Sequence, residues 1–214
     1  ALCSFCDRPL PRVPSARLVE LREELEGKSR PCPVPGNPGH REASMVHFST
    51  YCELHRIECE IFPIAIAREW PFDPDFTTLF DRVIGLKSAL TTICEEPEDS
   101  SFFRAAKDFY TPKPWPTLPG SEPRQLPSST QLQSIYGETG YQIMTVAVRF
   151  MFPDVLDLAP FKPLVYDTLV REVLMPEAAR RIVQEDLKLT LFAAKNTLKD
   201  SHLFGSVQHP ASDD

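Results

Sequence analysis

The clearest chemical features of this sequence are two short motifs, each with two residues of types that bind metal ions. Cys3-x-x-Cys6 stands near the start of the chain, and Cys52-x-x-His55 follows much later. A C-x-x-C turn presents two thiolates to one tetrahedral ion, and the second pair supplies the other two ligands. Four protein ligands fill the coordination shell of Zn²⁺ and leave no open position. The expected site is therefore structural, and metal binding there would add to the free energy of folding.

The residues around the second pair predict the element that carries it. Apolar and ligand-type side chains between positions 48 and 62 recur at the spacing of one helix face. Residues three apart on a helix are neighbours, so Cys52 and His55 could share one ion. We therefore expect a helix over residues 44–61. The face consists of Phe48, Tyr51, Cys52, His55, Cys59 and Phe62.

Two alternatives remain for these residues. The six cysteines could form three disulfides, although the first 30 residues carry charges throughout and show no signal peptide. Cys52 and His55 could also be core residues, with Cys3 and Cys6 an incidental pair near the chain end.

For the remaining cysteines we expect burial of Cys59 and Cys94 in apolar helical faces and exposure of Cys32 in a Pro-rich loop.

Arginines near the start of the chain form a possible nucleic-acid contact. Arg8, Arg12 and Arg17 are the candidates, with Arg22 close by. Phosphate backbones are bound by clustered cations. The chain as a whole is acidic, with 23 basic and 30 acidic residues and a net charge of -7. The competing interpretation is a solvated helix face, because glutamates at 20, 23 and 24 are interleaved with these arginines.

The composition indicates a folded, mainly helical chain. Its 214 residues are 42% hydrophobic and include 22 prolines but only 8 glycines. This composition excludes a collagen, a coiled coil and a fully disordered chain. No apolar stretch approaches the roughly 20 residues that span a bilayer. The prolines mark boundaries between helices rather than a low-complexity segment.

Helical periodicity and caps predict one helical domain over residues 1–200, followed by a disordered tail over 201–214. A Pro-rich loop is expected over residues 111–129. Ser15 is a candidate N-cap, either Ser100 or Ser101 could cap a short helix through Tyr110, and Thr139 is a candidate cap for the helix after it. The expected helices cover residues 15–27, 44–61, 77–94, 101–110, 141–152, 164–174 and 176–199.

The sequence gives little support for an enzyme. It lacks G-x-S-x-G, a P-loop, G-x-G-x-x-G and H-E-x-x-H. The turn from Gly137 to Gly140 could receive an anion at a helix start, but an ordinary helix-initiating turn is the favoured interpretation. Glu177 follows Pro176 and fits a first-turn charge favoured by the helix dipole. We expect no catalytic residues.

Five motifs in order resemble the fungal RTC4-like domain, a family named for restriction of telomere capping. The resemblance extends over about residues 3–200. It implies a fungal protein of the nucleus, which could also occur in the cytoplasm, and a link to telomeres or chromatin. It implies no reaction. The motifs are Cys3-Ser-Phe-Cys6-Asp7-Arg8-Pro9-Leu10-Pro11, Cys52-x-x-His55-Arg56-x-Glu58, Trp70-Pro71, Tyr136-Gly137-Glu138-x-Gly140-Tyr141 and Val173-Leu174-x-Pro176-Glu177-Ala178.

These observations together predict a zinc-stabilised interaction module that binds a protein partner of unknown identity. The alternative is a DNA-binding domain that uses Arg8, Arg12 and Arg17. No membrane association is expected.

Overall fold

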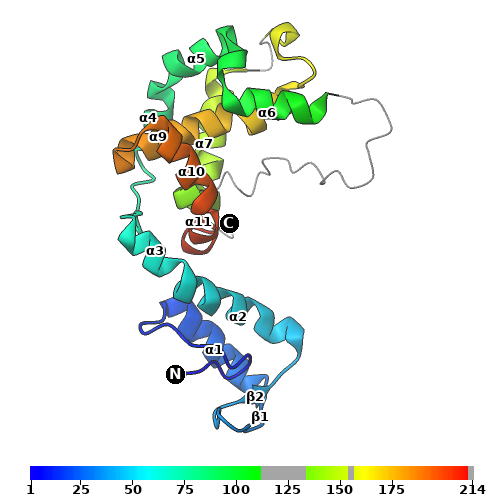
Figure 1. Cartoon of the computed structure of the whole chain (residues 1–214), viewed down its shortest axis with the longest axis vertical. Helices are drawn as coiled ribbons and strands as arrows, with labels where there is room; N and C mark the ends of the chain where they lie inside the picture. The colour runs from blue at the N-terminus through cyan, green and yellow to red at the C-terminus, as the bar shows by residue number, and fades with distance from the viewer. Residues whose placement is uncertain (112–133, 154–156, 212–214) are drawn as a thin grey trace. The chain divides into compact units, whose positions relative to one another are not determined.

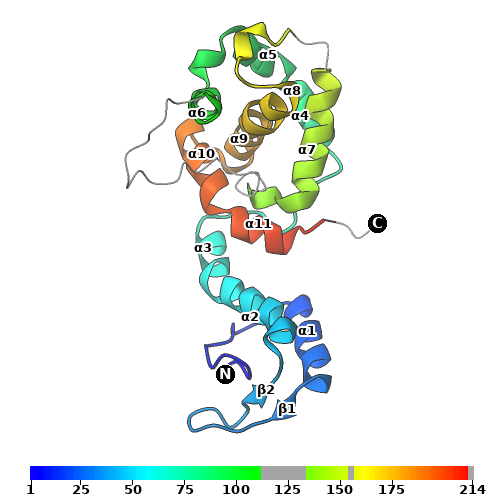
Figure 2. The same ribbon diagram turned by 90° about the vertical axis from the view of Figure 1, so that its right-hand side faces the viewer.

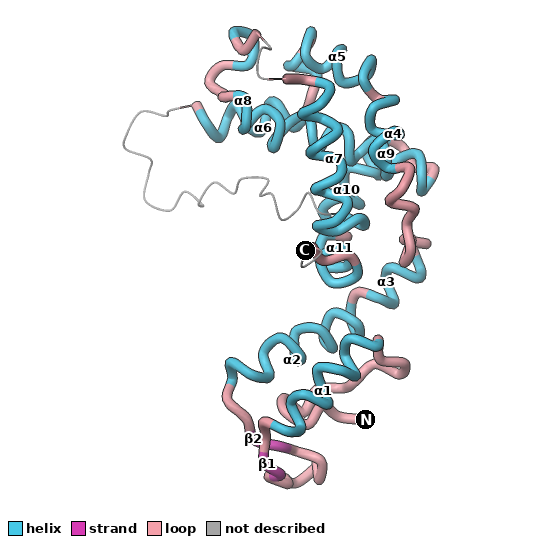
Figure 3. The backbone as a smooth tube through the Cα atoms, turned by 180° about the vertical axis from the view of Figure 1, so that it is seen from behind, coloured by secondary structure: helices cyan, strands magenta, loops and turns pink. Residues whose placement is uncertain are grey.

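The computed structural model describes residues 1–111, 134–153 and 157–211 and consists mostly of helices (Figure 3). We expected one domain over residues 1–200, whereas the chain divides into two compact units. Unit 1 is Ala1–Trp70 and unit 2 is Pro71–Asp214. The boundary lies at the Trp70-Pro71 turn, where a proline disfavours helix at the preceding residue. Each unit buries its own apolar core.

Unit 1 is a helical pair with a small β-ribbon. Helices α1 and α2 lie side by side (Figure 1). The two strands pair antiparallel, with Arg30 opposite Glu42, and Figure 2 shows them near the ends of both helices. The elements are α1 (Ala16–Gly27), β1 (Arg30–Pro31), β2 (Arg41–Glu42), α2 (Met45–Glu60) and α3 (Phe62–Ala67).

Helices α1 and α2 begin where the sequence predicts, and α3 was not predicted as a separate helix. Ser15 is the N-cap of α1, and its hydroxyl oxygen accepts a hydrogen bond from the Leu18 N–H at 3.1 Å. Pro63 lies in the first turn of α3, where its missing N–H removes no helical hydrogen bond. Leu18 of α1 and Tyr51 of α2 are both 2% exposed and form part of the core of this unit.

Unit 2 is built around α9, which lies between α7 and α10 (Figure 2). The first half of α9 is buried on nearly every side. Helix α7 is also strongly apolar in sequence, but its Val146 and Phe150 are 60% and 74% exposed. The elements are α4 (Leu79–Gly85), α5 (Lys87–Glu95), η1 (Pro97–Asp99), α6 (Ser101–Tyr110), η3 (Ser134–Tyr136), α7 (Gly137–Met151), η4 (Ala159–Phe161), α8 (Tyr166–Leu169), η5 (Val170–Leu174), α9 (Met175–Leu187), α10 (Leu191–Asp200) and α11 (His202–Gln208).

Several expected helices are divided differently in the structure. The helix expected over 77–94 breaks at Leu86, whose φ and ψ of -82° and 3° leave the helical region. The helix expected from 176 to 199 breaks at Lys188, which adopts a left-handed conformation with φ 51°. Residues 164–174 contain α8 and a π-helical stretch that runs directly into α9. Beyond Thr111, the expected loop over residues 111–129 lies outside the described residues.

The segment after residue 200 is folded as far as the structure describes it, which corrects the expected disordered tail over 201–214. Helix α11 buries Phe204 completely. The carbonyl oxygen of His209 accepts hydrogen bonds from the N–H groups of Glu138 and Thr139 at 2.9 and 3.4 Å. These donors belong to the first turn of α7, so the His209 carbonyl caps that helix. The same bonds occupy two N–H groups of the turn that we considered for an anion.

Burial of the His209 side chain should make the stability of unit 2 depend on pH. Its ring packs against Phe76, with ring centroids 5.2 Å apart, and burial lowers the pKa of His209 below its usual value. A lowered pKa means that the unfolded chain binds the proton more tightly. This contribution is therefore complete above about pH 6.5 and is lost as the pH falls through the folded-state pKa.

We expect His209→Gln to reduce the loss of thermal stability between about pH 7.5 and pH 5.5. Thermal unfolding followed by circular dichroism at both pH values measures this difference. His202→Gln changes a more exposed histidine at the start of α11 and is expected to keep the wild-type pH dependence. Identical pH dependence in His209→Gln and wild type would contradict the prediction.

Candidate metal centre

The four residues predicted as metal ligands lie together in unit 1. Their ligand atoms are all within 4.8 Å of one another. Cys3 Sγ lies 3.8 Å from Cys52 Sγ, and Cys6 Sγ lies 3.2 Å from His55 Nε2. Tetrahedral zinc with Zn–S bonds of about 2.3 Å separates two sulfur ligands by about 3.8 Å. The group therefore has the donor types and the spacing of a site that could hold a metal ion.

The surroundings of Cys3 favour its thiolate, whereas burial raises the pKa of Cys6. The chain folds back on itself there, with the Cys3 N–H donating to the Arg8 carbonyl at 2.8 Å. The Phe5 N–H points at Cys3 Sγ at 3.4 Å. A hydrogen bond from the Cys52 thiol, aided by backbone N–H groups and opposed by burial, lowers the pKa of Cys3 to about 5. A thiolate is the form that binds a metal ion.

Asp7 fixes the turn that follows Cys6. Its φ of 58° places it in the left-handed region, which a non-glycine residue adopts only when its contacts hold it there. The Asp7 carboxylate accepts a hydrogen bond from Asn37 Nδ2 at 2.7 Å and lies 3.0 Å from His40 Nδ1. Asn37 Nδ2 also donates to the Cys3 carbonyl at 2.9 Å. These contacts connect the Pro-rich loop before β2 to the turn that carries two ligands.

Helix α2 carries the other two candidate ligands on one face, as the spacing predicts. Cys52 and His55 are one turn apart, and His55 is completely buried. Nδ1 of His55 is buried and has no hydrogen-bond partner among the described residues. The ring lies against Tyr51, with centroids 5.7 Å apart, and burial raises the pKa of Tyr51 to about 12. Packing therefore holds the imidazole with Nε2 directed at Cys6.

Glu58 connects the ligand-bearing helix to α1. It is 4% exposed, and its two carboxylate oxygens accept hydrogen bonds from the N–H and the hydroxyl of Ser15 at 3.0 and 2.5 Å. A negative charge at the N-terminus of α1 is also favoured by the helix dipole. The contact spans 43 residues of sequence, so neither helical periodicity nor a local capping motif could identify it.

We expect Glu58→Gln to destabilise unit 1 by about 1–3 kcal/mol, because the amide NH₂ cannot accept a hydrogen bond and would replace one of the two oxygens that accept from Ser15. Chemical denaturation followed by circular dichroism measures this loss. The control is Glu53→Gln on the exposed side of the same helix, which should change the unfolding free energy by less than about 0.5 kcal/mol. Equal unfolding free energies for the two variants would exclude the assigned role of Glu58.

The structure does not assemble Arg8, Arg12 and Arg17 into one site. All three are exposed, and no described contact joins them. Arg17 lies 3.4 Å from Glu20 on the same helix, in a pair exposed at both ends. Such pairs contribute little to stability. Among the described residues, neither Arg8 nor Arg12 forms an ion pair.

The other cysteines differ in exposure. Cys32 is exposed, which confirms the expectation for it. Cys59 and Cys94 are only partly buried, because each lies at the edge of its apolar face. Cys59 Sγ lies 3.4 Å from the Pro9 carbonyl, and burial raises the pKa of both thiols. None of these three cysteines belongs to the four-residue group.

Glu177 in unit 2 is a second buried acidic residue with several partners. It has no exposed surface and accepts hydrogen bonds from Ser100 Oγ at 2.8 Å, from Arg180 and from Arg181. Ser100 is also the N-cap of α6, as predicted, so Glu177 connects α9 to the start of α6. Removal of this carboxylate would leave both arginines without their buried partner and would therefore be strongly destabilising.

The fold and the site define a mainly helical protein with a Cys₃His group that could bind a metal ion. The chain belongs to the RTC4-like domain family, whose sequence model matches residues 95–210, more than half of the chain. The match contains the motif around Gly137 and the motif around Pro176, and the four ligand residues precede it. No curated protein and no solved structure matches the chain. Within the described residues, no helix combines the length and apolar character of a membrane span.

Proposed function

We propose that the chain is a non-enzymatic interaction module that Zn²⁺ stabilises and that binds a protein partner in a nuclear, chromatin- or telomere-related setting. The convergence of Cys3, Cys6, Cys52 and His55 is the observation that carries this proposal. Three thiolates and one imidazole form a common ligand set of structural zinc sites. Four protein ligands leave no coordination position for a substrate, so the ion would hold the fold together.

The contacts around the ligands support a structural role. The turn with Cys3 is tied to Asn37, and the helix with Cys52 is tied to Ser15 through Glu58. Zinc would therefore connect segments that are also linked by hydrogen bonds, and unit 1 would present a preorganised surface. Preorganisation lowers the entropic cost of binding a partner.

An affinity experiment with nuclear extract tests the interaction. We expect a protein that is retained by the wild-type chain and by Cys32→Ser but lost with Cys3→Ser/Cys6→Ser. The purified partner should then bind the purified chain directly. Retention of the same partner by the double variant would contradict a zinc-dependent surface.

The purified chain also allows a test of the alternative function, DNA binding. If Arg8, Arg12 and Arg17 bound nucleic acid, duplex or single-stranded DNA would be shifted in a gel at low salt, where contacts to phosphates are strongest. We expect no shift at low salt. A shift that disappears with rising salt would favour DNA binding over the protein-binding module.

A further inference from the structure

Unit 1 contains a pocket that is separate from the metal-ligand group. It has a volume of about 230 Å³ and lies between α1 and the segment that precedes it. Its walls include Leu10, Pro11, Leu18 and Val19, and none of the four ligand residues lines it. Pockets for drug-sized molecules measure roughly 300–1,000 Å³. This smaller space suits one large side chain better than a cofactor.

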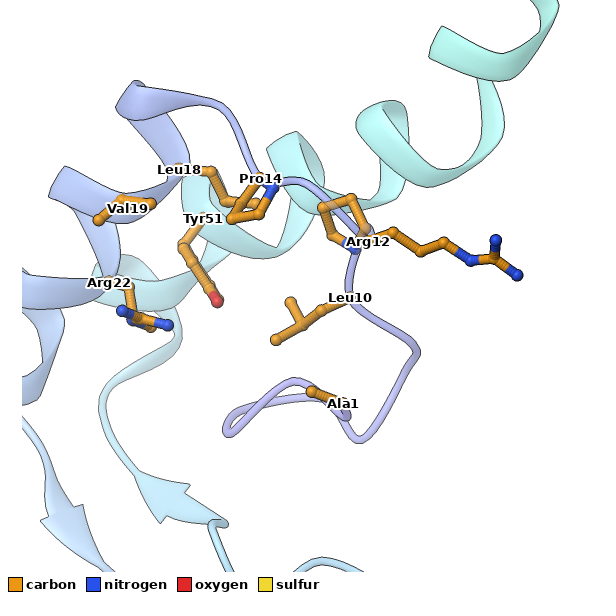
Figure 4. Close-up of a pocket in the computed structure, with 9 residues that line it drawn as sticks. Ala1, Leu10, Arg12, Pro14, Leu18, Val19, Arg22 and Tyr51 are labelled. Atoms are coloured by element: carbon orange, nitrogen blue, oxygen red, sulfur yellow. The ribbon is translucent and has the colours of Figure 1, made fainter.

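The hydroxyl of Tyr51 is a polar group in the wall of this pocket. Tyr51 is 2% exposed, and Figure 4 shows its oxygen directed into the space between α1 and Leu10. No described residue hydrogen-bonds to this hydroxyl. The ring is held in place by Phe5, with centroids 5.8 Å apart, and by His55. The hydroxyl opens into the pocket, so a ligand that accepts its hydrogen bond would replace water there and add a directional contact to the apolar ones.

The charge at the rim is positive. Arg22 lines the pocket, and its ion pair with Glu26 is long, at 3.8 Å, with both side chains about half exposed. Its guanidinium can therefore turn to a ligand at little cost. Arg12 also lines the pocket, but in Figure 4 its guanidinium points away from it. No acidic residue is among the described residues that line the space.

We propose that this pocket binds a peptide segment of a partner protein through one large apolar side chain with a carboxylate next to it. The apolar side chain enters between Leu10, Leu18 and Val19. The carboxylate meets Arg22 and accepts the hydrogen bond from Tyr51. This inference rests on the proposed function as an interaction module and identifies the surface that would carry it.

A nucleic-acid backbone fits this surface less well than such a peptide. Helix α1 carries exposed glutamates at 20, 23, 24 and 26, which would repel a polyanion. A single carboxylate placed beside Arg22 would instead experience mainly the attraction of that one guanidinium. The apolar walls also favour an aliphatic or aromatic side chain over a phosphate.

Defined peptides test the proposal with the full chain. The probes are acetyl-Gly-Ser-Leu-Asp-Gly-Ser-amide, the same peptide with Phe in place of Leu, one with Ala in place of Leu, and one with Asn in place of Asp. We expect the Leu and Phe peptides to shift the amide resonances of Leu18, Val19 and Tyr51 in ¹H–¹⁵N spectra. The Ala and Asn peptides should bind at least about tenfold more weakly, which corresponds to the loss of the apolar anchor or the charge pair.

Two variants and one matched control locate the site. Arg22→Glu and Tyr51→Phe should each weaken binding of the Leu peptide by at least about fivefold. Arg17→Glu makes the same charge change on α1 outside the pocket and should bind like wild type. Absence of shifts at millimolar peptide, or equal binding by Arg22→Glu and Arg17→Glu, would overturn the proposal. Larger shifts of the same residues with DNA, or a concentration-dependent dimer that explains them, would also overturn it.

Zinc content and helical circular dichroism measured on the same samples separate the two proposals. If the chain holds zinc and binds its partner while the amide resonances of the pocket residues do not shift with peptide, the pocket assignment fails and the proposed interaction module stands. If the folded chain holds no zinc, the proposed function fails whatever the peptides do.

Discussion

Replacing Cys52 by serine is expected to abolish the cooperative folding of unit 1 while unit 2 stays folded. The substitution removes one of four proposed ligands and leaves Cys3 and His55 buried and Cys6 partly buried around an incomplete site. Structural zinc contributes on the order of 10 kcal/mol to small domains, which is comparable to the total stability of a domain. The helical signal of α1 and α2 should therefore be lost. Circular dichroism, with hydrogen exchange resolved along the chain, measures this change.

The control for Cys52→Ser is Cys32→Ser, which removes an exposed thiol outside the ligand group. It should change neither helix content nor exchange. Incubation of the wild-type chain with a strong chelator should reproduce the Cys52→Ser result, and added zinc should reverse it. Native helix content and exchange protection in Cys52→Ser would show that the four residues do not hold a structural metal.

Gly205→Ala is expected to destabilise unit 2 strongly. A Cβ at this position would lie 1.7 Å from the Ser134 carbonyl oxygen and 2.7 Å from the Gly137 nitrogen. Both contacts are to backbone atoms, which cannot move aside as a flexible side chain could. Overpacking of this kind costs about 3 kcal/mol or more where the surroundings cannot relax. Equilibrium denaturation gives the difference in unfolding free energy.

Gly85→Ala provides a matched control for this close approach. No atom lies within 4 Å of a Cβ at Gly85, the last residue of α4. Because alanine loses less backbone entropy than glycine on helix formation, this variant should be as stable as wild type or more stable by about 0.5 kcal/mol. If Gly205→Ala lowered stability no more than Gly85→Ala does, the close contact between α11 and the start of α7 would be refuted.

Local sequence signals were sufficient to predict the ligand group and several helix starts. The spacing of Cys3 with Cys6 and of Cys52 with His55 predicted one site, and the structure brings these residues together. Ser15 and Ser100 cap the helices assigned to them because N-capping depends on only a few consecutive residues. The helix face that carries two ligands follows from apolar periodicity in the same way.

The contacts that support the site could not be predicted, because they join distant parts of the chain. Glu58 contacts Ser15 and Asn37 contacts the Cys3 carbonyl across 43 and 34 residues. The end of α9 at Lys188 carries no glycine, so the usual C-terminal signal was missing there. Because the sequence after residue 200 is polar, a disordered tail was expected there instead of α11. The stability of α11 depends on burial of Phe204 and on close packing at Gly205.

The zinc-to-protein ratio of the purified full chain tests the central claim most directly. Metal analysis by inductively coupled plasma mass spectrometry should give about one zinc per wild-type chain, and one in Cys32→Ser. The ratio in Cys3→Ser/Cys6→Ser should fall below about 0.3 together with the helix content of unit 1. A folded wild-type chain with a ratio below about 0.3, or a double variant that keeps both zinc and fold, would contradict the assignment of Cys3, Cys6, Cys52 and His55 as a structural zinc site.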